Sequence, residues 1–217
     1  MRNKVVVVVV TLLLAGVGFF VAIKQYKNQE TQRLGFMAEK NFKAFVPDYA
    51  PRMGAQDPKV YLVEFLDPEC ESCRHFHPVV KEIVEEFKQS VQLVIRYAPF
   101  HGNSEFAIRV LEGARKQDRY WETLALLFEK QPSWGDHHHP QPELIWTFLA
   151  EAGVDVEKIR SSMNDPETSK MIALEVESGK QIGVRQTPTF FVNGKPVEMA
   201  GLGDLRLAVK NEVERKD

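Results

Sequence analysis

Two cysteines lie three positions apart, and they are the residues of this chain best suited to chemistry. Cys70 and Cys73 are the only cysteines among 217 residues, and Glu71 and Ser72 separate them. A disulfide between them closes too small a loop to stabilise a fold, because the entropic benefit of a crosslink grows with loop length. Two inert thiols have no physical reason to adopt this spacing after an apolar run. The pair therefore indicates redox or metal chemistry.

The segment around the pair predicts a strand, a turn and the start of a helix. The apolar run 60–66 has strand length, Asp67-Pro68-Glu69 is typical of a turn, and apolar residues recur at helical spacing from 73 to 89. Free backbone N–H groups at a helix start favour an anion and lower the pKa of a thiol there. We therefore expect Cys70 to be the nucleophile and Cys73 the resolving thiol.

The remaining pattern predicts an α/β domain with several helices between its two halves. A second strand, 91–97, completes a βαβ unit with the first strand and helix. Asn193-Gly194 predicts a type I′ turn between two short strands. The other expected elements are helical segments at 104–130, 142–152, 155–162, 166–180 and 202–216, with a loop at 131–142.

Three motifs resemble the thioredoxin superfamily and, within it, the DsbA-like thiol–disulfide oxidoreductases. Pro78 lies five residues after the second cysteine, and Glu64 lies six residues before the first. The segment 186–194, Gln-Thr-Pro-Thr-Phe-Phe-Val-Asn-Gly, is similar to the cis-proline loop of these proteins. The resemblance covers about residues 58–215. It implies a thioredoxin-like fold with a helical insertion at about 104–180, and no cofactor.

The resemblance also implies roles for residues near the cysteines. Glu64 would be a buried carboxylate with a raised pKa that relays a proton during exchange. The alternative is a structural carboxylate paired with a base such as Arg96. Pro188 would follow a cis peptide bond and face the disulfide, since proline tolerates that isomer. Gln186 and Thr187 would contact the substrate.

The resemblance implies an enzyme that exchanges disulfides with exported proteins, acts as an oxidant and has a membrane redox partner. Glu71 places an acidic side chain beside the thiolate, which should raise its pKa and make the pair less oxidising. Two alternatives stay open. One is a reductase or isomerase fed by a membrane electron donor, and the other is a module that delivers Cu(I).

Histidines lie near the pair and in the 131–142 loop. His75 and His77 follow the cysteines within the predicted helix, where surface or capping roles are common. His137-His138-His139 with Asp136 could bind copper or zinc. Three adjacent histidines in a loop rarely direct all their rings at one ion, so we expect no metal site.

The first 23 residues predict a transmembrane anchor. Val5 to Ile23 contains 19 residues without a charge, about the length that crosses a bilayer as a helix. Phe20 is bulky where signal cleavage needs a small residue, although Gly16-Val17-Gly18 is a weaker cleavage site. We expect an anchor at 1–23, a stalk at 24–57 and a catalytic domain at 58–217. That domain would face the periplasm or the cell exterior from the cytoplasmic membrane.

The overall composition suits a globular domain and gives no sign of a nucleic-acid partner. Apolar residues make up 44% of the chain and charged residues 27%, which is sufficient for a normal core. The formal net charge is −2, so the chain lacks the excess of basic residues that nucleic-acid binding requires.

Overall fold

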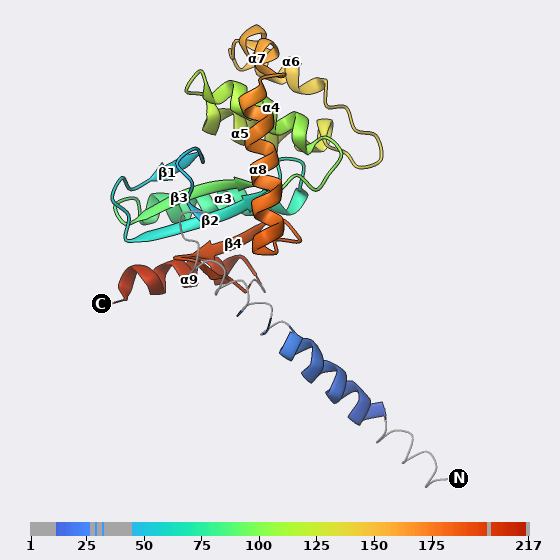
Figure 1. Ribbon diagram of the computed structural model, residues 1–217, viewed down its shortest axis with the longest axis vertical. Coiled ribbons are helices and arrows are strands. Elements are labelled where there is room, and N and C mark those ends of the chain that lie inside the picture. The colour runs from blue at the N-terminus through green and yellow to red at the C-terminus, as the bar shows by residue number, and fades with distance from the viewer. Residues whose placement is uncertain (1–11, 27–28, 30–31, 33–44, 199–200, 216–217) are drawn as a thin grey trace.

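A five-stranded mixed sheet forms the centre of the protein. The computed structural model describes residues 12–26, 29, 32, 45–198 and 201–215 (Figure 1). The sheet order is β1-β3-β2-β4-β5. Its strands are β1 (Arg52–Gly54), β2 (Val60–Leu66), β3 (Val91–Tyr97), β4 (Thr189–Val192) and β5 (Lys195–Pro196). Among the described strands the β2–β3 pair is parallel, because α3 (Glu71–Glu86) crosses over between these two strands, and the other pairs are antiparallel.

Most of the helices lie between the two halves of the sheet in sequence. They are α4 (Ser104–Arg115), α5 (Tyr120–Trp134), α6 (Leu144–Glu151), α7 (Val156–Ser162) and α8 (Pro166–Ile182). The closing helix α9 (Leu202–Glu214) follows the last strand. Helices α4 to α7 gather in a layer at one end of the molecule, and α8 runs from that layer down to the sheet (Figure 1). The expected α/β fold with a helical insertion is therefore observed.

Side-chain alternation divides the core between the two faces of the sheet. Leu62 and Leu66 of β2 join the cluster that contains both cysteines, whereas Val63 and Phe65 join a second cluster on the opposite face. Neighbouring strand residues point to opposite faces. Glu64 therefore lies on the same face as the cysteines, which is the face covered by α3 and α9.

The structure differs from the sequence expectations mainly at the edges of elements. The stretch 104–130 is two helices, α4 and α5, separated at Asp118, whose φ is 57°. Strand β1 lies within the segment 24–57 that the sequence assigned to a stalk, and Phe45 is fully buried in the second core cluster. Three residues are too few to show strand alternation. The predicted Asn193-Gly194 turn is present, with positive φ at both residues.

The N-terminal segment contains a described helix at 12–26, whose large apolar side chains are exposed. Within the part of the chain that the structure describes, no helix is both long and apolar enough to cross a membrane. The predicted span from Val5 to Ile23 falls partly on residues 1–11, outside the described residues. The anchor therefore stays a prediction.

Candidate active site

Cys70 and Cys73 lie at the start of α3, as the sequence predicted. Cys70 is the N-cap residue in extended conformation, and no side chain caps the helix there. The first backbone N–H groups of a helix have no partner within it, so they are free to meet an anion. Both cysteines are free thiols, Cys70 being 6% exposed and Cys73 fully buried.

The two thiols have opposite acidities. A hydrogen bond from the Cys73 thiol is the main cause that lowers the pKa of Cys70 to about 5. Burial opposes this shift, and the side chain of Thr187 and the backbone N–H groups of Cys73 and Ser72 reinforce it. Burial first, then the hydrogen bond with Cys70 and the charge of Glu64, raise the pKa of Cys73 well above its ordinary value. Cys70 is therefore a thiolate near neutral pH, and Cys73 keeps its proton.

The predicted cis-proline loop faces the first cysteine. The Thr187–Pro188 peptide bond is cis, and Cys70 Sγ lies 3.3 Å from the carbonyl oxygen of Thr187. The Thr189 hydroxyl donates a 2.7 Å hydrogen bond to the carbonyl of Gln186. The structure thus brings the Thr187–Pro188 bond to Cys70. The roles of Gln186, Thr187 and Pro188 toward a substrate stay predictions.

Glu64 is a buried carboxyl that makes no ion pair with Arg96. It is 1% exposed, and its Oε1 has no hydrogen-bond partner. Burial, followed by the charge of Cys70, raises the pKa of Glu64 to about 8. Arg96 instead binds Glu175 of α8, with 2.9 Å from Nε to each carboxylate oxygen. Alternation explains the difference, because Arg96 pairs in register with Phe65 and Glu64 pairs with Ile95.

The turn before Cys70 is held by side chains that the sequence did not assign to the site. Asp67 accepts hydrogen bonds from the backbone N–H of Glu69 at 2.9 Å and of Phe100 at 2.8 Å. Gln131 of α5 donates from Nε2 to the carbonyls of Pro68 at 2.9 Å and Cys70 at 3.1 Å. Two carboxylates flanking a proline after a strand are a usable turn signal. Gln131 carried no signal in the sequence.

The histidines singled out in the sequence lie in α3 and in the loop after α5. His77 is partly buried against Phe128, with ring centroids 5.0 Å apart, and burial lowers its pKa to about 4. In the loop after α5, Asp136 accepts hydrogen bonds from the backbone N–H groups of His138 and His139 at 2.8 and 2.7 Å. Among the described residues, no group of three or more histidine, cysteine or acidic side chains is arranged to hold a metal ion.

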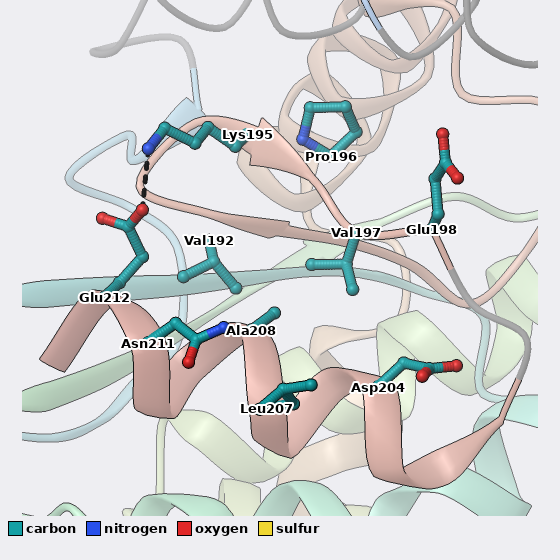
Figure 2. Close-up of a pocket in the computed structure, with 10 residues that line it drawn as sticks. All are labelled: Val192, Lys195, Pro196, Val197, Glu198, Asp204, Leu207, Ala208, Asn211 and Glu212. Carbon is teal, nitrogen blue, oxygen red and sulfur yellow. Dashed lines mark hydrogen bonds and ion pairs between the residues drawn. The ribbon is translucent and has the colours of Figure 1, made fainter. Parts of the chain in front are cut away.

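A groove of about 360 Å³ lies away from the cysteines, between the β4–β5 hairpin and α9 (Figure 2). Val192, Val197 and Leu207 line it, and an ion pair between Lys195 and Glu212 lies at its edge. Its lining contains none of the predicted site residues.

Comparison with known proteins agrees with this geometry. The profile of a family described as thioredoxin matches residues 48–211. Disulfide bond formation protein D of Bacillus subtilis is 26% identical over 175 residues, which are 76% of this chain and 78% of that protein. A solved thioredoxin-like oxidoreductase from Silicibacter pomeroyi is 26% identical with a TM-score of 0.68, over 80% of this chain and 98% of that one.

A third relative has a name that refers to ion transport. The Na(+)/H(+) antiporter NhaA of Herminiimonas arsenicoxydans is 30% identical over 142 residues, 65% of this chain. The match spans only 22% of the length of that antiporter. The likeness therefore concerns one part of the antiporter and carries nothing about ion transport to this chain.

Proposed function

We propose that this chain, which belongs to the thioredoxin family, is a thiol–disulfide oxidoreductase that oxidises exported proteins through Cys70 and Cys73. The observation that carries the proposal is the opposite acidity of the two thiols, with a pKa of about 5 for Cys70 and a raised pKa for Cys73. The relation to a protein named for disulfide bond formation supports it.

The geometry accounts for both steps of an oxidation. A substrate thiolate attacks the Cys70 sulfur of the oxidised pair and forms a mixed disulfide, while Cys73 leaves as a thiolate. Glu64, whose pKa is about 8, is protonated near neutral pH and gives that proton to Cys73. A second substrate thiolate then attacks the substrate sulfur, and Cys70 leaves. A thiol of low pKa is the better leaving group, so Cys70 favours release of the oxidised substrate.

The acidity of Cys70 favours the oxidant over the reductase. A stabilised thiolate stabilises the reduced form, and this makes the disulfide form a stronger oxidant. The acidic Glu71 was expected to oppose this, but its side chain is exposed, where water screens its charge. A membrane redox partner would re-oxidise the pair after each cycle.

The proposed location is the outer side of the cytoplasmic membrane, with the chain anchored by its N-terminal segment. The 19 uncharged residues from Val5 to Ile23 support an anchor. An oxidising compartment is where a protein that donates disulfides can find thiols to oxidise.

The test is the reduction potential of the pair, measured by equilibration with glutathione, together with oxidation of a reduced dithiol peptide. A potential near about −120 mV supports the oxidant, whereas a value near about −270 mV indicates a reductase fed by a membrane donor. Cys70→Ser should abolish exchange, and Cys73→Ser should accumulate the mixed disulfide. Unchanged exchange in Cys70→Ser would reject the proposal.

A further inference from the structure

Two acidic side chains are buried immediately before the reactive cysteine. Asp67 is fully buried and Glu69 is 2% exposed. Glu69 accepts hydrogen bonds from the backbone N–H and the side-chain amide of Asn103, at 2.6 and 2.7 Å. A buried carboxylate is costly unless it is hydrogen-bonded or paired with a cation. A negative Cys70 adds a third charge to this small region.

His101 is the basic group that faces these charges. Its Nδ1 lies 2.8 Å from Asp67 Oδ2, and its backbone N–H donates to the same oxygen at 3.3 Å. Within the described part of the chain, His101 is the one basic side chain that forms an ion pair with either buried carboxylate. Its side chain is 28% exposed, so protons can exchange between this ring and water.

The neighbouring charges act on His101 in a definite direction. Burial lowers the pKa of His101, but the hydrogen bond and charge of Asp67, then the charges of Cys70 and Glu69, outweigh burial and raise it. The charge of Cys70 belongs only to the reduced protein, because a sulfur in a disulfide cannot ionise. The environment of His101 therefore depends on the redox state of the pair.

We propose that His101 is a redox-linked proton site, which holds a proton while Cys70 is a thiolate and releases it when Cys70 and Cys73 form their disulfide. This inference rests on the proposed exchange activity. Asp67 orients the ring through Nδ1, and His101 acts on the chemistry through its charge. His101 is thus a positioning residue. Its charge stabilises the thiolate of Cys70, and its role needs no bond to the substrate.

Disulfide exchange needs one more proton than the cysteine pair supplies, and His101 can provide it. When a partner disulfide is reduced, its two sulfurs take up two electrons from the pair and two protons to become thiols. Cys73 supplies one proton, but Cys70 is already a thiolate and supplies none. The second proton comes from His101. In the oxidising direction the partner gives up two protons. One restores the proton that Glu64 has given to Cys73, and His101 takes the other.

Other titratable groups also face His101. They are Asp67, Glu69 and Cys70 from the turn between β2 and α3, and His137 from the segment after α5, whose ring centroid lies 5.2 Å from that of His101. His101 forms the ion pair with Asp67 and the neighbouring His137 does not, which makes His137 the matched control.

The direct test is an NMR titration of the histidine rings in the full chain. One sample is reduced with dithiothreitol and the other oxidised with diamide, and His101→Asn assigns the His101 signal. We expect His101 to titrate at a higher pH in the reduced protein than in the oxidised protein. Equal titration midpoints in the two forms overturn the inference. Because both forms are prepared chemically, this result does not depend on whether the protein exchanges disulfides with partners.

A second measurement is the pH dependence of Cys70 alkylation by iodoacetamide. His101→Asn keeps a donor for Asp67 and removes the charge, so the pKa of Cys70 should rise; each unit of rise lowers the thiolate fraction tenfold below that pKa. His137→Gln should leave the midpoint where it is in the wild type. An unchanged midpoint in His101→Asn overturns the inference. Loss of all exchange in the wild type, with the titrations as expected, would instead reject the proposed function.

Discussion

Glu64 should make the stability of the reduced protein depend on pH in a way that Glu64→Gln removes. Burial and the charge of Cys70 raise the pKa of this carboxyl from 4.5 to about 8. A group with a raised folded-state pKa binds its proton more tightly in the folded protein than in the unfolded one. Its contribution to stability is therefore complete below about pH 4.5 and is lost as the pH rises through about 8.

The size of the effect follows from the shift. A change of about 3.5 pKa units at about 1.36 kcal/mol per unit corresponds to about 5 kcal/mol. Roughly 3.5 kcal/mol of this stability is lost between about pH 5 and pH 8. Cys70 contributes in the opposite sense, because its pKa is lowered in the folded protein. Its contribution to stability is complete above the ordinary thiol pKa of 9.0 and is lost as the pH falls through about 5. The difference between wild type and variant removes the Cys70 contribution, since both proteins carry this thiol.

The assay is guanidinium unfolding of the reduced wild type and reduced Glu64→Gln at pH 5, 6, 7 and 8. We expect the unfolding free energy of the wild type to fall relative to the variant as the pH rises. Glu71→Gln, at an exposed position beside the same thiol, is the control, and its curve should stay parallel to the wild type. A parallel curve for Glu64→Gln would refute the assignment of Glu64 as a buried, protonated carboxyl.

Three further predictions concern the thiol and its supports. Alkylation of Cys70 by iodoacetamide should show a midpoint near pH 5, and a midpoint near the ordinary thiol pKa would contradict the thiolate. Gln131→Leu removes the donor to the Pro68 and Cys70 carbonyls and should cost about 1–3 kcal/mol in guanidinium unfolding; an unchanged midpoint would contradict that role. Arg96→Met leaves Glu175 buried without its ion pair and should cost about 3–5 kcal/mol in urea unfolding. Adding Glu175→Leu should recover much of that loss, and no recovery would contradict the reasoning.

The sequence predicted the elements whose pattern is local. The apolar run of β2, the helical spacing of α3 and the Asn193-Gly194 turn each lie within a few residues, and all three are present. The spacing of Cys70 and Cys73 and the proline loop near 188 also placed the centre of the site. These features could be predicted because each depends on residues that are close together in the sequence.

The parts that escaped prediction depend on contacts between distant segments. Glu64 could have paired with Arg96 on charge alone, and only the strand register places the two on opposite faces of the sheet. Gln131 reaches the turn before Cys70 across more than 60 positions of sequence. Strand β1 is three residues long and exists because it pairs with β3. None of these contacts leaves a periodic pattern in the sequence.

The hydrogen bonds from Asn103 and Gln131 to the turn before Cys70 affect how the protein could be divided into modules. Both residues belong to the part of the chain inserted between the two halves of the sheet. A shortened chimera that joins β3 directly to α8 would remove both supports together with His101. The segment between β3 and α8 thus supports the reactive turn, and replacing it would change the surroundings of Cys70 as well as the shape of the molecule.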